Sequence, residues 1–174
     1  MKKFLPVLFC GLCLLIAAPL HAKNNDLADA MQVIDTYVET YQKGDANSLL
    51  KLMSKDFQAE TKEEWAELPH LFQLKSILLQ KSEYEIIAIE KDAYDDEVEI
   101  AVTVSLIMPD IDQIMSTIPE SVLDEFETDA ELIEFMVKKL PELLVNAEKF
   151  DKNEERIDIT LIKENGRWKV DEEY

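Results

Sequence analysis

The residue types that most often carry catalysis or metal binding are scarce in this chain. Cys10 and Cys13 both lie in the first 22 residues, and His70 is the only histidine beyond that stretch. One histidine cannot build a histidine-rich zinc site, and a Ser-His-Asp triad would depend on His70 alone. Because no motif surrounds His70, we interpret it as a surface or interhelix residue. The sequence therefore predicts no metal site.

The scarcity of glycine also excludes several kinds of binding site. Gly44 and Gly166 are the only glycines after residue 22, so the chain has neither a Walker loop nor a dinucleotide-binding fingerprint. The acidic runs at 92–97 and 124–131 lack the glycine that a calcium loop needs for its sharp turn. We interpret both runs as solvated acidic surface, with weak divalent-cation binding as the alternative. We expect no cofactor.

The overall charge restricts the partners of this protein. The 174 residues include 18 basic and 37 acidic side chains, which gives a net charge of −19. Such a charge repels nucleic-acid phosphates and anionic membrane surfaces. We therefore expect no nucleic acid, and a neutral ligand or a basic protein is the easier partner.

The first 22 residues have the layout of a secretory signal peptide. Lys2 and Lys3 precede an apolar run, and small or helix-breaking residues precede Ala22. Cleavage after Ala22 predicts an exported protein, periplasmic or secreted, without a membrane anchor, whose residues 23–174 form one domain. Leu20 stands where a small residue is usual, so an uncleaved anchor is the alternative.

The next part of the chain has helical periodicity. Apolar residues at helical spacing from Leu27 to Tyr41 predict a first helix that Gly44 ends, and Asp45 can cap a short second helix that reaches Met53. We expect Phe57 to begin a short extended piece. A capping-box pattern at Thr61 predicts a third helical region to about residue 81, with a kink or restart at Pro69.

The periodicity then changes to that of strands. Residues 84–91 and 98–108 predict a hairpin around the turn-like segment 92–96, with one buried face that includes the even positions 98–108. A second hairpin from Arg156 turns at Asn165-Gly166, where both central residues need a positive φ. Residues 109–153 predict a helical insertion in which Thr128 caps a long helix that Pro141 interrupts. The predicted class is α+β.

The order of these elements resembles the nuclear-transport-factor-2-like superfamily. Two segments carry the resemblance: VIDTYVETYQKGDANSLLKLMSKDF, and the terminal NGRWKV. The resemblance implies the cone-shaped, cystatin-like fold shared with ketosteroid isomerases and SnoaL-like cyclases. In this fold, amino-terminal helices pack on a curved, mostly antiparallel sheet, here with the insertion at 109–153 between the two hairpins. The superfamily hosts enzymes, carriers and interaction modules on one scaffold.

The resemblance also implies candidate catalytic residues. Tyr37, Tyr41 and Asp56 most nearly match the oxyanion-hole tyrosine and the aspartate base of the isomerases in this superfamily. The inward strand positions, however, hold valine, isoleucine and leucine where a buried acid would be expected. Tyrosines in an apolar stripe are usually core residues, and an aspartate after a helix usually serves a turn or cap. We therefore expect no catalytic residue.

The expected function is binding without catalysis. The cavity between the helices and the sheet would hold a small apolar ligand or a segment of a partner protein. The expected ligand-binding residues are Tyr37, Tyr41, Trp65, Phe72 and Met115. One alternative is an isomerase or dehydratase that uses Asp56 as base with Tyr37 or Tyr41. Another is a protein-interaction or immunity-type module, including a homodimer that pairs through its sheets.

Overall fold

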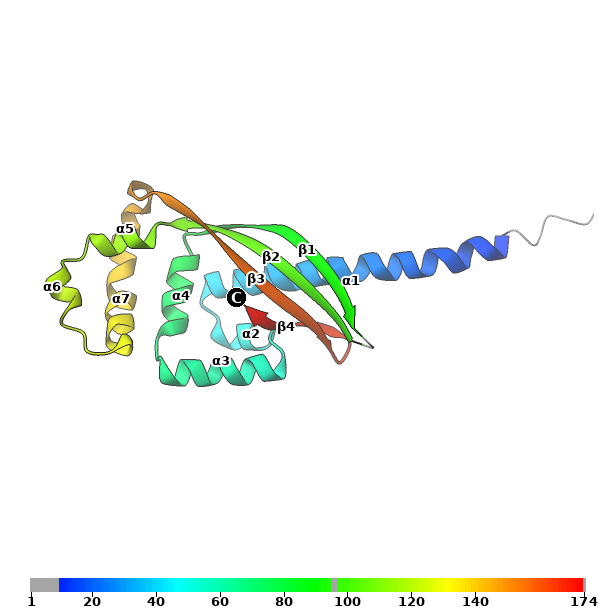
Figure 1. The fold of residues 1–174 in the computed structure, drawn as a ribbon, viewed down its shortest axis with the longest axis horizontal. Helices are drawn as coiled ribbons and strands as arrows, with labels where there is room; N and C mark the ends of the chain where they lie inside the picture. Colours follow the sequence, from blue (N-terminus) through cyan, green and yellow to red (C-terminus); the bar gives the residue numbers. More distant parts are fainter. Residues whose placement is uncertain (1–9, 95–96, 174) are drawn as a thin grey trace, which may run out of the picture.

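The computed structural model describes residues 10–94 and 97–173, and these form an α+β fold in which helices pack against a four-stranded antiparallel sheet. The strand order is β1-β2-β3-β4, as Figure 1 shows. The elements, in chain order, are α1 (Cys10–Lys43), α2 (Ala46–Leu50), α3 (Lys55–Glu67), α4 (Leu71–Leu79), β1 (Glu83–Tyr94), β2 (Glu97–Pro109), α5 (Ile111–Ser116), α6 (Glu120–Leu123), α7 (Asp129–Leu143), the 3-10 helix η1 (Leu144–Lys149), β3 (Lys152–Glu164) and β4 (Arg167–Glu173).

The end of α1 and the start of α2 are as predicted. Gly44 has φ +70° and donates its amide hydrogen to the Tyr41 carbonyl at 2.9 Å, so the left-handed residue ends the helix. The Asp45 carboxylate then accepts from the Ser48 amide at 3.0 Å and caps α2. Because α1 begins at Cys10, it extends well before the predicted start at Leu27.

The signal peptide stays a prediction. It overlaps residues 1–9, which lie outside the described residues, and the first part of α1. Among the described residues, no helix combines the length and the apolar character that a membrane crossing requires.

The segment around Phe57 differs from the prediction. Residues 55–67 form one helix, because the Ser54 hydroxyl accepts from the Phe57 amide at 3.1 Å and caps α3. Thr61 is consequently a buried residue within α3 and does not begin a helix. The extended piece lies earlier, where Met53 forms an isolated parallel bridge with Val170 of β4. The predicted restart at Pro69 is confirmed, since α4 begins two residues later.

Both hairpins are confirmed. Every even position from Ile100 to Met108 is buried and faces the helices, as predicted. In the second hairpin, Asn165 and Gly166 have φ of 50° and 77°, and Leu161 pairs with Val170. The strands are longer than expected: β1 runs into the predicted turn as far as Tyr94, and β3 begins at Lys152. The rest of that first turn, residues 95–96, lies outside the described residues.

The helical insertion is confirmed, with one correction. Thr128 and Glu131 form the predicted capping box at the start of α7. Pro141 does not interrupt that helix, which continues to Leu143. A proline so close to the end of a helix removes only one backbone hydrogen bond, and the backbone leaves the helical region later, at Asn146.

Two apolar clusters hold these elements together. The first joins buried residues of α1 and α2 to the inner face of the sheet, with Ile34, Tyr37, Val102 and Leu161 near its centre. The second joins the insertion to α4, not to the sheet. In Figure 1, the insertion accordingly stands at one end of the sheet, and α1 projects from the other end.

Candidate functional site

Four of the five predicted ligand-binding residues come together in one aromatic chain. The rings of Tyr37 and Tyr41 on α1 meet edge to face at 5.4 Å between centroids. Tyr41 then contacts Phe72 of α4 at 5.5 Å, and Phe72 contacts Trp65 of α3 at 4.9 Å. Met115, the fifth residue, is apart from this chain, because α5 places it against the second apolar cluster. The insertion packs mainly against α4, although Ile111 at the start of α5 also contacts the cluster between α1 and the sheet.

A small cavity lies between α1 and the inner face of the sheet. Its volume is about 20 Å³, and Tyr37, Tyr41 and Leu106 are among the residues that line it. Sites for small organic molecules are roughly 300–1,000 Å³, whereas about 10–15 Å³ suffices for one water. This cavity is therefore large enough for a water molecule but too small for the expected apolar ligand.

A hydrogen bond ties the aromatic chain to the end of the last strand. The Tyr37 hydroxyl donates to Glu173 Oε2 at 2.6 Å, and Tyr37 is only 2% exposed. Burial, and next the charge of Glu173, raise the pKa of Tyr37 well above its usual range, and the same two causes raise the pKa of Tyr41. Both hydroxyls are therefore protonated at neutral pH, and that of Tyr37 donates to Glu173.

Asp56 does not join these tyrosines. It is exposed in the first turn of α3, where the positive end of the helix dipole stabilises a carboxylate. An isomerase of the expected type needs its base enclosed beside the oxyanion donors. The three candidate catalytic residues are thus divided between the interior and the surface, which does not favour the isomerase alternative.

An open pocket lies where α1, α3 and α4 meet the end of β4. We call it the acidic pocket; its volume is about 250 Å³. Its lining residues are Tyr41, Phe57, Glu60, Thr61, Glu64, Lys75 and Glu173. Glu60 and Glu64 are one helical turn apart on α3, which places both carboxylates on one face of the helix.

In the part of the chain that the structure describes, the carboxylates of the acidic pocket form no close ion pair with the lysine that lines it. Among the described residues, Lys75 forms no ion pair with Glu60, Glu64 or Glu173. The charge of Glu64 also contributes, after burial and Glu173, to the raised pKa of Tyr41. Three carboxylates beside aromatic rings form an environment that attracts an ammonium or guanidinium group.

A second acidic hollow lies on the insertion. It has a volume of about 560 Å³, and the rings of Phe126 and Phe135 meet in it at 5.0 Å. Its carboxylates already have partners in two cases: Glu134 pairs with Lys138 at 2.6 Å, and Glu131 completes the cap of α7. This hollow is therefore less suited to a cation than the acidic pocket.

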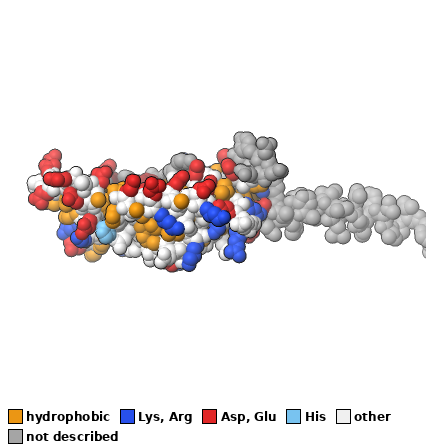
Figure 2. Space-filling view, turned by 90° about the horizontal axis from the view of Figure 1, so that it is seen from below, with side chains coloured by type: hydrophobic (Ala, Val, Ile, Leu, Met, Phe, Trp, Pro, Cys, Tyr) orange, Lys and Arg blue, Asp and Glu red, His pale blue; other side chains and the backbone are white. Residues whose placement is uncertain are grey.

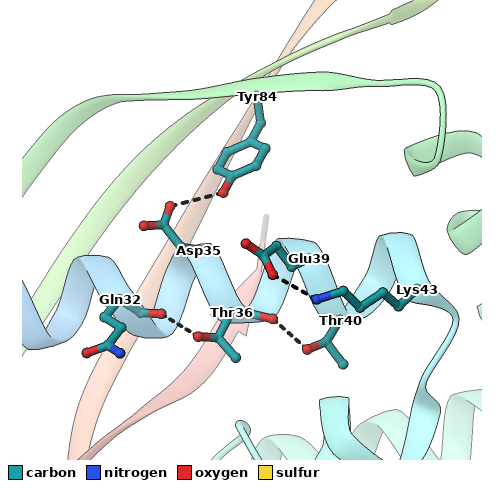
Figure 3. A network of polar contacts seen from close by, with 7 residues as sticks. All are labelled: Gln32, Asp35, Thr36, Glu39, Thr40, Lys43 and Tyr84. Atoms are coloured by element: carbon teal, nitrogen blue, oxygen red, sulfur yellow. Dashed lines mark hydrogen bonds and ion pairs between the residues drawn. The ribbon is translucent and has the colours of Figure 1, made fainter.

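A polar network connects the outer side of α1 to β1. Figure 3 shows Tyr84 donating to Asp35 Oδ1, at 3.1 Å, and Lys43 paired with Glu39 at 2.8 Å. Burial, followed by the hydrogen bond and charge of Asp35, raises the pKa of Tyr84 to about 12. Every group in this network has a structural partner, so we assign it to holding the helix against the sheet.

The structure gives His70 a local role. Its Nδ1 lies 2.9 Å from Gln73 Oε1, and the exposed residue stands at the start of α4 with φ 78°. Across the described ranges, no group of three or more His, Cys, Asp or Glu side chains is arranged to hold a metal ion.

No protein-family model and no curated protein matches this chain. The function is therefore argued from the chemistry of the residues that line the acidic pocket. Sequence reasoning selected Tyr41 but missed Glu60, Glu64 and Glu173. Their only signal was the one-turn spacing of the two α3 glutamates, which has little weight among 37 acidic residues.

Proposed function

We propose that this protein is a non-catalytic binding protein whose acidic pocket receives a lysine or arginine side chain from a partner protein. One observation carries the proposal: three carboxylates without an internal ion-pair partner lie beside aromatic side chains in an open pocket, whereas the cavity between α1 and the sheet has a volume of only about 20 Å³. In this proposal, the segment of a partner protein binds at the edge of the helices and not, as expected from the sequence, between the helices and the sheet.

The dimensions and chemistry of the acidic pocket fit one long basic side chain. Its aliphatic stem would lie against Tyr41 and Phe57, and its charged end would lie among Glu60, Glu64 and Glu173. The net charge of −19 would steer a basic partner toward the protein from a distance.

We also propose that the fold is the cone-shaped, cystatin-like one of the nuclear-transport-factor-2-like superfamily, in an exported member. Three features support this proposal. Helices precede the sheet in the expected order, Tyr37 and Tyr41 are buried between α1 and the sheet, and the terminal NGRWKV forms the predicted hairpin. The helix at 55–67, where a short strand was expected, is a departure from the superfamily pattern.

Binding of a fluorescent oligo-lysine peptide tests the pocket. We expect the double variant Glu60→Gln/Glu64→Gln to weaken the affinity, measured by fluorescence anisotropy at physiological salt, by about fivefold, because exposed ion pairs contribute up to about 1 kcal/mol. Both residues are exposed on α3, so the variant should fold.

The matched control is Glu148→Gln/Glu155→Gln, which removes two exposed carboxylates outside the acidic pocket and changes the net charge equally. Equal losses of affinity in the two variants would show that peptide binding depends only on the net charge of the protein, and the proposed function would then be wrong.

A further inference from the structure

A groove beside α1 gathers positive charge in this strongly acidic protein. It has a volume of about 440 Å³ and lies between α1, the segment that follows α2, and the β3–β4 hairpin. We call it the basic groove; its charged lining residues are Lys51, Lys163, Arg167, Lys169 and the single carboxylate Asp29. It shares no lining residue with the acidic pocket.

The surface shows the same separation of charge. In Figure 2, most of the visible Lys and Arg side chains lie along the lower part of the body, and Asp and Glu side chains follow its upper edge. In this protein acidic residues outnumber basic ones by about two to one. Around this groove the ratio is reversed, because four basic side chains and one acidic side chain line it.

Two of these basic side chains are held by the protein itself. Lys163 pairs with Asp26 at 2.8 Å, and its ammonium lies 5.2 Å from the centre of the Trp168 ring. The Lys169 ammonium donates to the Lys51 carbonyl. These contacts fix positive charge at the wall of the groove, although Asp26 partly neutralises Lys163.

The other two are available to a ligand. Within residues 10–94 and 97–173, neither Lys51 nor Arg167 forms an ion pair, and both are exposed. Gly166 beside them leaves open space, since a Cβ built there would meet nothing within 4 Å.

The groove also borders an unsatisfied donor. Trp168 lines it and is 6% exposed, and its indole Nε1 has no hydrogen-bond partner among the described residues. Buried N–H groups without an acceptor are rare in folded proteins. This donor is itself buried, so the charged donors that the groove offers to a ligand are its lysine and arginine side chains.

We propose that the basic groove binds a phosphate-bearing ligand. Phosphate oxygens accept bidentate hydrogen bonds from an arginine such as Arg167 and attract the point charge of a lysine such as Lys51. At physiological salt, charges farther than about 8 Å are largely screened. The local cations therefore decide binding in the groove, despite the net charge of −19.

The phosphate can belong to a soluble compound or to the headgroup of an anionic lipid, and two probes separate these sources. Pyrophosphate binding is measured by titration calorimetry. Cosedimentation is measured with vesicles of phosphatidylcholine, with and without phosphatidylglycerol. Both experiments use the full chain.

The test variant is Lys51→Gln/Arg167→Gln, and the matched control is Lys81→Gln/Lys149→Gln, which removes two exposed cations outside the basic groove. We expect the test variant to bind about fivefold more weakly than the wild type, and the control to change little.

A loss of binding confined to the test variant supports the proposal. If the loss affects pyrophosphate binding, the ligand is a soluble compound. If it affects only binding to the anionic vesicles, the ligand is a lipid headgroup. Binding of neither probe, or equal losses in both variants, would overturn the proposal. The variant Glu60→Gln/Glu64→Gln should bind both probes normally, so failure here is distinct from failure of the proposed function.

Discussion

The hydroxyl of Tyr37 links the aromatic chain to the last strand. It is buried, and it donates to Glu173 near the carboxyl end of the last strand. This single bond links α1 to β4 beside the acidic pocket, because Glu173 also lines that pocket. One residue thus serves the stability of the interior and the charge of the surface.

Replacing Tyr37 with phenylalanine tests this bond. We expect Tyr37→Phe to lower the free energy of unfolding by about 1–2 kcal/mol at neutral pH, because it removes a hydrogen bond to a charged group. Urea unfolding followed by circular dichroism measures the change. An unchanged free energy would mean that the Tyr37 hydroxyl adds nothing to stability.

The same residue predicts a dependence on pH. The pKa of Tyr37 is raised in the folded protein above the value of about 10 in an unfolded chain. Its contribution to stability is therefore fully present below pH about 10 and is lost as the pH rises through the folded-state pKa. We expect the wild type to lose stability more steeply than Tyr37→Phe above pH about 10, and parallel curves in urea titrations would contradict this.

At the scale of elements, backbone conformation decides where α1 ends and where the last hairpin turns. Gly44 and Gly166 have similar positive φ values, 70° and 77°. Their surroundings differ, since a Cβ at Gly44 would lie 3.2 Å from Ser76 Oγ of α4, whereas none of the described atoms lies within 4 Å of one at Gly166.

The two glycines form a matched pair for mutation. We expect Gly166→Ala to lower the free energy of unfolding by about 1 kcal/mol, the backbone cost of a left-handed alanine. Gly44→Ala should cost more, because the buried Ser76 must also move. Thermal and urea unfolding measure the two losses of free energy, and their difference is the cost of the contact between the end of α1 and α4. Equal losses would show that α4 can shift to accommodate the added methyl group at no cost.

At the scale of the whole molecule, unbalanced charge opposes folding. The protein has 37 acidic and 18 basic side chains, and most ion pairs of the described residues are exposed and so contribute little. Self-repulsion in the compact state is therefore the larger electrostatic effect.

Added salt should consequently stabilise the protein. We expect the melting temperature to rise between low and physiological NaCl by roughly 2–4 °C, which corresponds to about 1 kcal/mol for a chain of this size. The control variant Glu148→Gln/Glu155→Gln should show a smaller rise because it has less charge to screen. A melting temperature that falls with salt would mean that the ion pairs outweigh the repulsion.

The sequence by itself determined most of the elements and the α+β class. Local chemistry was sufficient for the end of α1 at Gly44, the cap at Thr128, the turn at Asn165-Gly166 and the alternation in β2, because each depends on residues close together in the chain. The prediction was wrong at 55–67, where Thr61 resembled a cap but Ser54 took that role. Two cap signals lay close together, and the pattern does not show which one the backbone uses.

Only the tertiary structure decided where a ligand has room. The small volume of the cavity between α1 and the sheet, the separation of Met115 from the aromatic chain, and the two charged pockets all depend on how distant segments pack. Lys51 and Arg167 are far apart in the sequence, as are Glu60 and Glu173, so no spacing pattern connects them. Net charge predicted repulsion of phosphates and anionic membranes, but charge acts over about one screening length, and the fold brings four cations to the wall of one groove.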